Sequence, residues 1–284
     1  MQEKVIIGVD LGGTNVSVGR IGGLVIEKKS KINISADQNE ELVVSEIIET
    51  IKKVFTENVQ GIGVGVPGVV DSVNGIVYDV QNIPSWKEVQ LKDILTKHFN
   101  VPVYIENDAN CFAVGEKYFG KAMNYQNCVG LILGTGMGAG IIINNHLYSG
   151  KNCGAGEFGM LPYKESNYEA YCSGQFFRKK YTMDGADVFK KAELGDKKAI
   201  DIFREFGENL GNGIKAILYT LDTDMIVLGG SVSKSYKYFK DAMWNTMNDF
   251  AYHKVIENII VEPSEEPEIA ILGAGALYYN TIEK

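Results

Sequence analysis

The stretch Lys4-Val-Ile-Ile-Gly-Val-Asp10-Leu-Gly-Gly-Thr14 decides the fold class, because it joins an apolar run directly to a glycine turn. The run over 4–10 predicts a buried β-strand. Partly alternating stretches at 16–20 and 24–28 flank Ile21-Gly22-Gly23, which predicts a hairpin after the turn. A glycine turn that leads into a hairpin, rather than into a helix, argues against a dinucleotide-binding fold.

Apolar strands and amphipathic helices alternate along the rest of the chain. The strand at 128–133 again ends in a Gly/Thr turn and precedes a hairpin-like pair, which indicates an internal duplication of one β/α unit. We also expect Asp108 to cap the helix that follows it. Strands are predicted at 62–66, 101–105, 128–133, 139–144, 147–150, 225–228 and 259–261, and helices at 39–57, 108–119, 199–220, 236–251 and 272–283.

The bulk composition excludes several classes of protein. Of 284 residues, 45% are hydrophobic and 23% charged, as in ordinary globular proteins. A net charge of −8 without a Lys/Arg block argues against a nucleic-acid partner. No apolar run approaches the roughly 20 residues of a membrane span, and the N-terminal stretch lacks the pattern of a signal peptide. The four cysteines form no CxxC pair, so we expect reduced thiols in a cytoplasmic protein.

The two glycine turns are candidate phosphate-binding loops. Glycines let backbone N–H groups approach a phosphate closely, and the hydroxyl of Thr14 can add a donor. The carboxylate of Asp10 is placed to hold Mg²⁺, directly or through water. Each turn alone is equally consistent with a tight hairpin. The Walker pattern GxxxxGK[ST] is absent, which excludes a P-loop NTPase.

Several ordered motifs resemble those of the ROK family of sugar kinases and sugar-responsive repressors. They are Asp10-Leu-Gly-Gly-Thr14-Asn15, Val64-Gly-Val-Pro-Gly68, Gln81-Asn-Ile-Pro-Ser-Trp86, Ile105-Glu-Asn-Asp-Ala-Asn110, Leu133-Gly-Thr-Gly136, Gly154-Ala-Gly-Glu-Phe-Gly159 and Leu228-Gly-Gly-Ser231. The resemblance implies an α/β actin-like ATPase (ribonuclease H-like) fold with two lobes around a central cleft. We expect a smaller N-terminal lobe at 1–118, joined by the returning helix at 272–284, and a larger lobe at 119–271.

The resemblance also implies the site residues. Asp108 is expected to accept the proton of the sugar 6-hydroxyl as the base, and ATP with Mg²⁺ near Asp10 to be the phosphoryl donor. The family likeness further implies a homodimer. The sugar-binding residues would be Gly68, Asn82, Asn107, Asp108, Glu157 and Glu169, and the nucleotide-binding residues Asp10, Gly12, Gly13, Thr14, Asn15, Gly134, Thr135, Gly136, Gly229 and Gly230.

One segment departs from the family pattern. Met160 stands where the family has a histidine, and the Cys-rich zinc loop before Glu169 is missing, so we expect no structural zinc. Tyr163, Tyr168 and Tyr171 are expected to order the replacing loop by packing. Met160 either lies at the sugar or belongs to the core.

The missing zinc loop favours an N-acetylmannosamine kinase, because some ROK kinases of that specificity lack the loop. A glucokinase or another hexose kinase is the alternative. A ROK regulator is a weaker alternative, because the first predicted strand begins too early for a preceding helix-turn-helix. An ATPase that needs no sugar is disfavoured by the Glu106-Asn-Asp108 motif together with Glu157.

Overall fold

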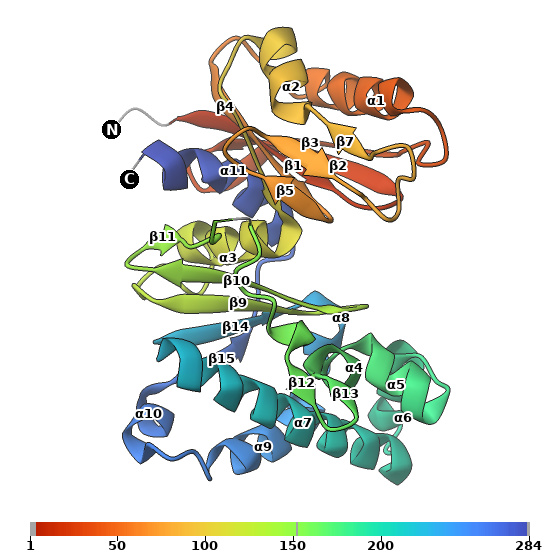
Figure 1. Ribbon diagram of the computed structural model, residues 1–284, viewed down its shortest axis with the longest axis vertical. Helices are drawn as coiled ribbons and strands as arrows, with labels where there is room; N and C mark the ends of the chain where they lie inside the picture. The colour runs from red at the N-terminus through yellow and green to blue at the C-terminus, as the bar shows by residue number, and fades with distance from the viewer. Residues whose placement is uncertain (1–3, 152, 283–284) are drawn as a thin grey trace. The chain divides into compact units, whose positions relative to one another are not determined.

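A computed structural model describes residues 4–151 and 153–282. The chain divides into two compact units, one formed by residues 1–124, 140–155 and 266–284, and the other by 125–139 and 156–265. The C-terminal segment therefore returns to the first unit, where the blue helix of Figure 1 meets the red first strand. The lobe limits expected from the sequence, 1–118 with 272–284 and 119–271, stay a prediction.

A five-stranded mixed sheet in the order β3-β2-β1-β4-β8 forms the centre of the first unit. β1 and β2 as well as β2 and β3 are antiparallel, whereas β1, β4 and β8 run parallel. In register, Asp10 lies opposite Gly65, and Gly65 lies opposite Glu106. The carboxyl ends of three parallel strands thus share one edge, where α/β proteins commonly bind ligands. The bounds are β1 Val5–Leu11, β2 Asn15–Gly22, β3 Val25–Asn33, β4 Val59–Val66 and β8 Val103–Asn107.

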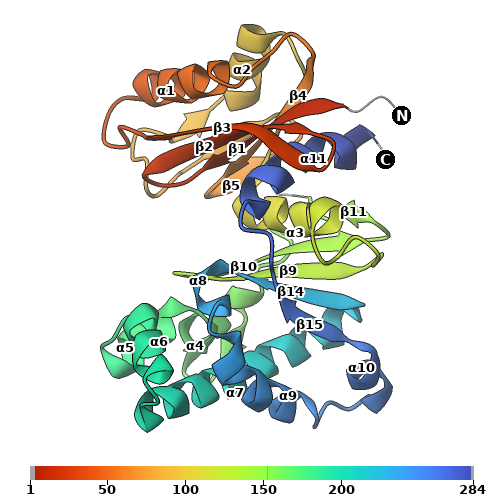
Figure 2. The same ribbon diagram turned by 180° about the vertical axis from the view of Figure 1, so that it is seen from behind.

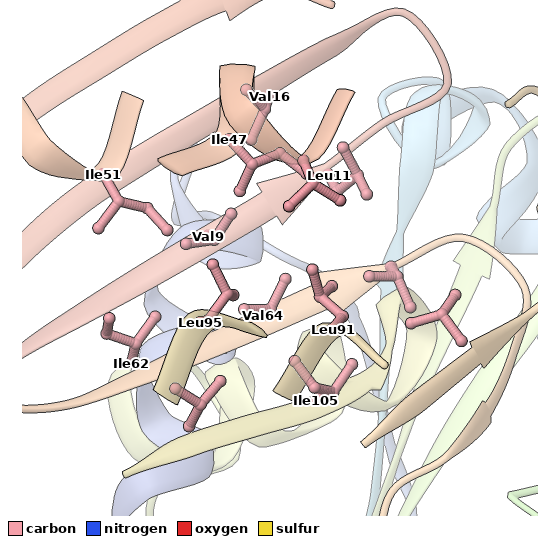
Figure 3. Packing of buried hydrophobic residues seen from close by; sticks show 14 of the residues in the cluster. Val9, Leu11, Val16, Ile47, Ile51, Ile62, Val64, Leu91, Leu95 and Ile105 are labelled. Atoms are coloured by element: carbon pink, nitrogen blue, oxygen red, sulfur yellow. The ribbon is translucent and has the colours of Figure 1, made fainter. Parts of the chain in front are cut away.

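Aliphatic side chains fill the space between this sheet and two helices, α1 (Glu40–Lys52) and α2 (Leu91–Phe99). α1 begins where Asn39 accepts a hydrogen bond from the Leu42 N–H, with acidic residues in its first turn and Lys52 in its last, as the helix dipole favours. Each fully buried aliphatic side chain contributes about 1.5–3 kcal/mol. Figure 3 shows this packing for Val9, Leu11, Val16, Ile47, Ile51, Ile62, Val64, Leu91, Leu95 and Ile105.

Helix α11 (Ile269–Ile282) lies against β1, β4 and helix α3 (Asp108–Phe119), as Figure 2 shows from behind. A Cβ atom at Gly63 of β4 would lie 1.7 Å from the Ala274 carbonyl oxygen. Only glycine at this position lets the helix backbone come so close to the sheet. The first unit also holds a small three-stranded sheet: β5 (Val69–Asp71), β6 (Ile76–Tyr78) and β7 (Glu88–Val89).

The second five-stranded sheet has the order β11-β10-β9-β14-β15, with β14 parallel to both β9 and β15. Helices α7 (Lys197–Leu221) and α9 (Tyr236–Met247) pack on each other below it in Figure 1. The strands are β9 Cys128–Leu133, β10 Met137–Ile143, β11 His146–Leu147, β14 Met225–Gly229 and β15 Ile260–Pro263. The remaining elements are η1 Phe158–Met160, β12 Pro162–Tyr163, β13 Ser166–Asn167, α4 Tyr168–Cys172, α5 Gly174–Tyr181, α6 Gly185–Glu193, α8 Gly230–Ser233 and α10 His253–Asn258.

Most predicted strands and helices are confirmed, and the errors lie at their ends. The first helix ends at Lys52 and not at 57, because the chain turns there while Val54 stays buried. The strand predicted at 147–150 is confined to His146–Leu147. The strands β5, β6 and β7 escaped prediction because two or three residues carry no readable period. Within the described ranges, no helix combines the length and apolar character needed to cross a membrane.

Candidate active site

Asp108 is the first residue of α3 and directly follows the last residue of β8. Its Oδ1 accepts a hydrogen bond from the backbone N–H of Ala109 at 2.8 Å. Burial raises the pKa of Asp108, and the hydrogen bond from Ala109 opposes the shift. A carboxylate taken partly out of water in this way is a stronger proton acceptor than one at the surface.

The prediction that Asp108 caps α3 is wrong, because the N-cap residue is Asn107. Asn107 has the extended backbone of a cap, with φ −63° and ψ 150°, and its Oδ1 accepts from the Ala109 N–H at 2.9 Å. Its Nδ2 donates to the Gly68 carbonyl oxygen at 3.1 Å. Gly68 has a φ of +130°, which only glycine adopts without strain. The amide of Asn107 therefore ties the turn after β4 to the start of α3.

Asp10, close to the end of β1, lies near enough to Asp108 for their charges to interact. Burial and then the negative charge of Asp108 raise the pKa of Asp10 to about 6, while Lys31 opposes the shift. The described part of the chain holds no cluster of three or more His, Cys, Asp or Glu side chains suited to a metal. A cation at Asp10 would hence take most of its ligands from water and phosphate, which suits Mg²⁺.

Glu106 is a further functional candidate, which the sequence analysis named in a motif without giving it a role. Its buried carboxylate accepts hydrogen bonds from the Asn107 N–H at 3.2 Å, from Asn110 Nδ2 at 2.8 Å and from Ser149 Oγ at 2.9 Å. The stretch 105–110 holds four polar residues directly after an apolar strand, and this pattern could have indicated a functional role for Glu106. Glu106 thereby fixes the backbone on which Asp108 stands and links it to Ser149.

The first glycine turn joins β1 to β2. The Gly12 N–H donates to the Asn15 carbonyl oxygen at 2.8 Å, and Asn15 Nδ2 donates to Thr14 Oγ1 at 3.3 Å. The structure also brings Gly13 against Asn82, which the sequence analysis had assigned to sugar binding rather than to this turn. The first unit therefore gathers Asp10, the 12–15 turn, Asn82, Gly68, Asn107 and Asp108 through these pairwise contacts.

The second glycine turn follows β9, and Gly229-Gly230 stands at the end of the neighbouring parallel strand β14. A Cβ atom at Gly230, where φ is +82°, would lie 2.4 Å from the Leu133 carbonyl oxygen. The two turns are therefore in contact, as expected if both serve one nucleotide.

A cavity of about 710 Å³ opens beside these turns, within the size range of small-molecule sites. Gly134, Thr135 and Ser231 contribute backbone-rich walls, and Phe177 and Phe203 contribute apolar ones. Its charged residues belong to segments without a motif, so sequence reasoning missed them. They are Arg178, Asp184, Asp187, Lys190, Glu193 and Lys234.

The two predicted sugar carboxylates of the second unit differ in their surroundings. Glu157 is exposed, and among the described residues its carboxylate has no hydrogen-bond partner. Glu169 is half-buried and accepts hydrogen bonds from the Met137 N–H and from Gln175. The alternative that Met160 belongs to the core is wrong, because its side chain is 51% exposed.

A hairpin of β12 and β13 lies between Met160 and Glu169. Tyr163 stacks on Tyr168 with ring centroids 4.5 Å apart and meets Tyr171 edge-on at 5.4 Å. Lys164 Nζ lies 5.1 Å from the ring centroids of Tyr163 and Tyr171 and donates to Asn209 Oδ1 at 2.6 Å. The three tyrosines therefore pack on one another, and Lys164 extends the cluster. That this packing orders the loop stays a prediction.

Comparison with known proteins gives one family. The model described as the ROK family matches residues 6–281. A Thermotoga maritima glucokinase is 28% identical over 312 residues, with 98% of each chain covered. A Bacillus subtilis xylose repressor is 28% identical over 278 residues, covering 89% of this chain and 72% of the repressor.

Two solved structures share the fold over nearly their whole length. A Streptomyces griseus ROK glucokinase in complex with glucose and AMPPNP has a TM-score of 0.78 and 25% identity, covering 96% of this chain and 98% of its own. A Listeria monocytogenes protein described as "a putative N-acetylmannosamine kinase" has a TM-score of 0.81 and 25% identity, covering 99% and 100%. The predicted α/β fold of the actin-like ATPase class is confirmed.

Proposed function

The chain belongs to the ROK family, and from this premise we propose that it is an ATP-dependent kinase that phosphorylates the 6-hydroxyl of N-acetylmannosamine. The observation that carries the proposal is the buried carboxylate of Asp108 at the start of α3, beside Asp10. Sugar-kinase activity is supported by the family and by the relatives named as kinases. The choice of N-acetylmannosamine is supported by Met160 and by one related structure.

Asp108 supplies the chemistry that a hydroxyl needs to become a nucleophile. Its carboxylate accepts the 6-hydroxyl proton as the sugar oxygen attacks the γ-phosphorus and the bond to the β-phosphate oxygen breaks. Asn107 and Glu106 hold the start of α3 in place through their hydrogen bonds. Mg²⁺ near Asp10 would neutralise charge on the phosphates.

The second unit offers the complementary nucleotide site. The cavity next to Gly134 and Thr135 has the volume for a nucleotide. Its wall carries both cationic and acidic side chains, and the cations Arg178 and Lys190 form ion pairs with two of the acids. The related glucokinase was solved with AMPPNP, which supports ATP as the phosphoryl donor.

N-acetylmannosamine is favoured over glucose by two observations. Met160 presents an exposed thioether where the family has an imidazole, and a flexible apolar group suits the methyl of an N-acetyl substituent. The Listeria protein carries the same suggested specificity. Glucose remains the alternative substrate, because the Thermotoga and Streptomyces relatives are named glucokinases.

A coupled assay of ADP release tests the proposal with glucose, N-acetylglucosamine and N-acetylmannosamine, using Asp108→Asn as the inactive control. We expect the highest kcat/KM with N-acetylmannosamine. The highest value with glucose would make the chain a glucokinase. ATP turnover that is independent of every sugar would refute the kinase proposal in favour of a sugar-independent ATPase. No turnover with any sugar of the panel would leave a sugar-responsive regulator, as the xylose repressor suggests.

We place the reaction in the cytoplasm, where ATP is available and the free thiols of Cys111, Cys153 and Cys172 would stay reduced. The homodimer implied by the family likeness is part of the proposal, and light scattering of the purified chain tests it.

A further inference from the structure

The carboxylate of Glu169 lies directly on the second glycine turn. Its Oε2 accepts a hydrogen bond from the Met137 N–H at 3.1 Å. A Cβ atom at Gly136 would lie 2.5 Å from the same oxygen. The position of the carboxylate and the conformation of the turn therefore constrain each other.

The segment that follows Glu169 holds the same turn at further points. Ser173 Oγ lies 2.7 Å from the Glu169 carbonyl oxygen and 3.2 Å from the Thr135 carbonyl oxygen, so the Ser173 hydroxyl can donate a hydrogen bond to either oxygen. The Gly174 N–H donates to the Gly134 carbonyl oxygen at 2.7 Å. Residues 169–175 thus contact the turn at Gly134, Thr135, Gly136 and Met137.

A second side chain fixes the carboxylate from the other side. Gln175 Nε2 donates to Glu169 Oε1 at 2.7 Å. Both carboxylate oxygens are therefore engaged, one by the turn and one by α5. Each oxygen keeps a further lone pair for a ligand, so a sugar hydroxyl can bind without breaking either bond.

We infer that Glu169 is a positioning residue for the nucleotide turn and couples sugar binding to nucleotide binding. This inference rests on the proposed function, together with the expectations from the sequence that Glu169 contacts the sugar and Gly134–Gly136 contact phosphate. A sugar hydroxyl that donates to Glu169 restricts the carboxylate, which keeps the Met137 N–H and the turn in the geometry that binds phosphate. By thermodynamic reciprocity, bound nucleotide then favours sugar to the same degree.

Glu157 provides the matched control. It is the other proposed sugar carboxylate of the second unit, but its side chain makes no hydrogen bond to the turn or to any other described residue. Glu157→Gln is therefore expected to weaken sugar binding without changing how the turn binds nucleotide.

A pair of variants separates the positioning of the turn by Glu169 from the contact of Glu169 with the sugar. In Glu169→Gln the amide keeps one acceptor oxygen for Met137. The Gln175 amide must then flip to accept from the new N–H₂ group, so the hydrogen bond to a charged carboxylate is replaced by a neutral one. The double variant Glu169→Gln/Gln175→Glu restores the pairing, since the new amide can donate to the new carboxylate and still accept from Met137. Only the charge at position 169 remains lost.

The first measurement is the dissociation constant of Mg–AMPPNP without sugar, by calorimetry. We expect Glu169→Gln to weaken binding by about 5- to 20-fold, as the replacement of a hydrogen bond to a charged group by a neutral one implies. The double variant should restore wild-type affinity, and Glu157→Gln should equal wild type. Wild-type affinity in Glu169→Gln would overturn the inference.

The second measurement is the ratio of the dissociation constants for AMPPNP without and with the best sugar of the panel. We expect a ratio of at least about 5 in the wild type, as coupled sites typically show, and of 1 in Glu169→Gln. Glu157→Gln at saturating sugar should keep the wild-type ratio. A ratio of 1 in the wild type, despite sugar turnover, would refute the coupling alone. The first measurement needs no sugar. A wrong proposed function is therefore distinguishable from a wrong positioning role of Glu169.

Discussion

Gly13 and Asn82 are packed so closely that a Cβ atom added at Gly13 would lie 2.5 Å from the Asn82 Cβ. In the first unit, therefore, a glycine of a proposed phosphate-binding turn directly contacts a proposed sugar-binding residue. Gly136 and Glu169 repeat this relationship in the second unit. At both positions glycine is needed because a neighbouring side chain occupies the space of a Cβ atom.

Replacing Gly13 by alanine is expected to raise the KM for ATP and for sugar together. The sequence alone predicts an effect mainly on ATP, whereas the contact with Asn82 adds the sugar. Overpacking of about 1–3 kcal/mol corresponds to about a 5- to 150-fold change. Steady-state kinetics of Gly13→Ala and of Gly13→Ala/Asn82→Gly, which removes the clash, check this. If the double variant binds ATP no better than Gly13→Ala, the contact with Asn82 is not the cause.

Asp108→Asn is expected to lower kcat by about 10²- to 10⁴-fold, the usual loss when a general base is removed. Asparagine keeps an oxygen for the Ala109 N–H, so the start of α3 should remain folded. Circular dichroism and the affinity for AMPPNP should match those of the wild type. A variant with near wild-type kcat would remove Asp108 from the role of base.

The sequence was sufficient for the main strands, the long helices and both glycine turns. Their signals are local: the apolar run of β1 and the strand at 128–133 both end visibly at glycines. The cap of α3 was assigned one residue late because Asn107 and Asp108 are both good caps, and only the backbone angles separate them.

The contacts across long sequence distances could not be predicted. Glu106 meets Ser149 from 43 residues away, and Asn82 meets Gly13, although neither pair shares a local pattern. Arg178 and Lys190 line the cavity from helices α5 and α6, and the sequences of these helices show only an amphipathic pattern of apolar residues. Tertiary folding creates these neighbours, so a single sequence carries no period or motif for them.

The carboxylate of Asp10 is expected to destabilise the folded protein at neutral pH. Its pKa is raised from 3.8 to about 6, so the folded chain binds the proton more tightly than the unfolded chain. The stabilising contribution of the protonated form is complete below about pH 4 and is lost as the pH rises through 6. The free energy of unfolding changes by at most about 3 kcal/mol through this shift of the Asp10 pKa.

Asp10→Asn should consequently be more stable than the wild type at pH 7.5 without metal, and should lack this decline between pH 4 and 6. Urea unfolding at several pH values measures it. Asp71→Asn is the control of opposite sign, because hydrogen bonds from Asn74 lower the pKa of the exposed Asp71 carboxyl. Equal stability of Asp10→Asn and wild type at pH 7.5 would contradict the assignment.

The tyrosine cluster around the β12–β13 hairpin should stabilise the fold without metal. Tyr163 packs on two aromatic rings, and its hydroxyl lies 3.2 Å from both Asn209 Oδ1 and Asn212 Nδ2. Tyr163→Phe keeps the packing and should cost about 1 kcal/mol, the value of a hydrogen bond. Tyr163→Ala should cost more, about 1–3 kcal/mol, because the half-buried ring is lost. Tyr252→Ala, at a 65% exposed side chain, should stay within about 0.5 kcal/mol of the wild type. Urea unfolding with and without EDTA measures all three, and a chelator-induced loss of stability would show that a metal, not the tyrosines, holds the hairpin.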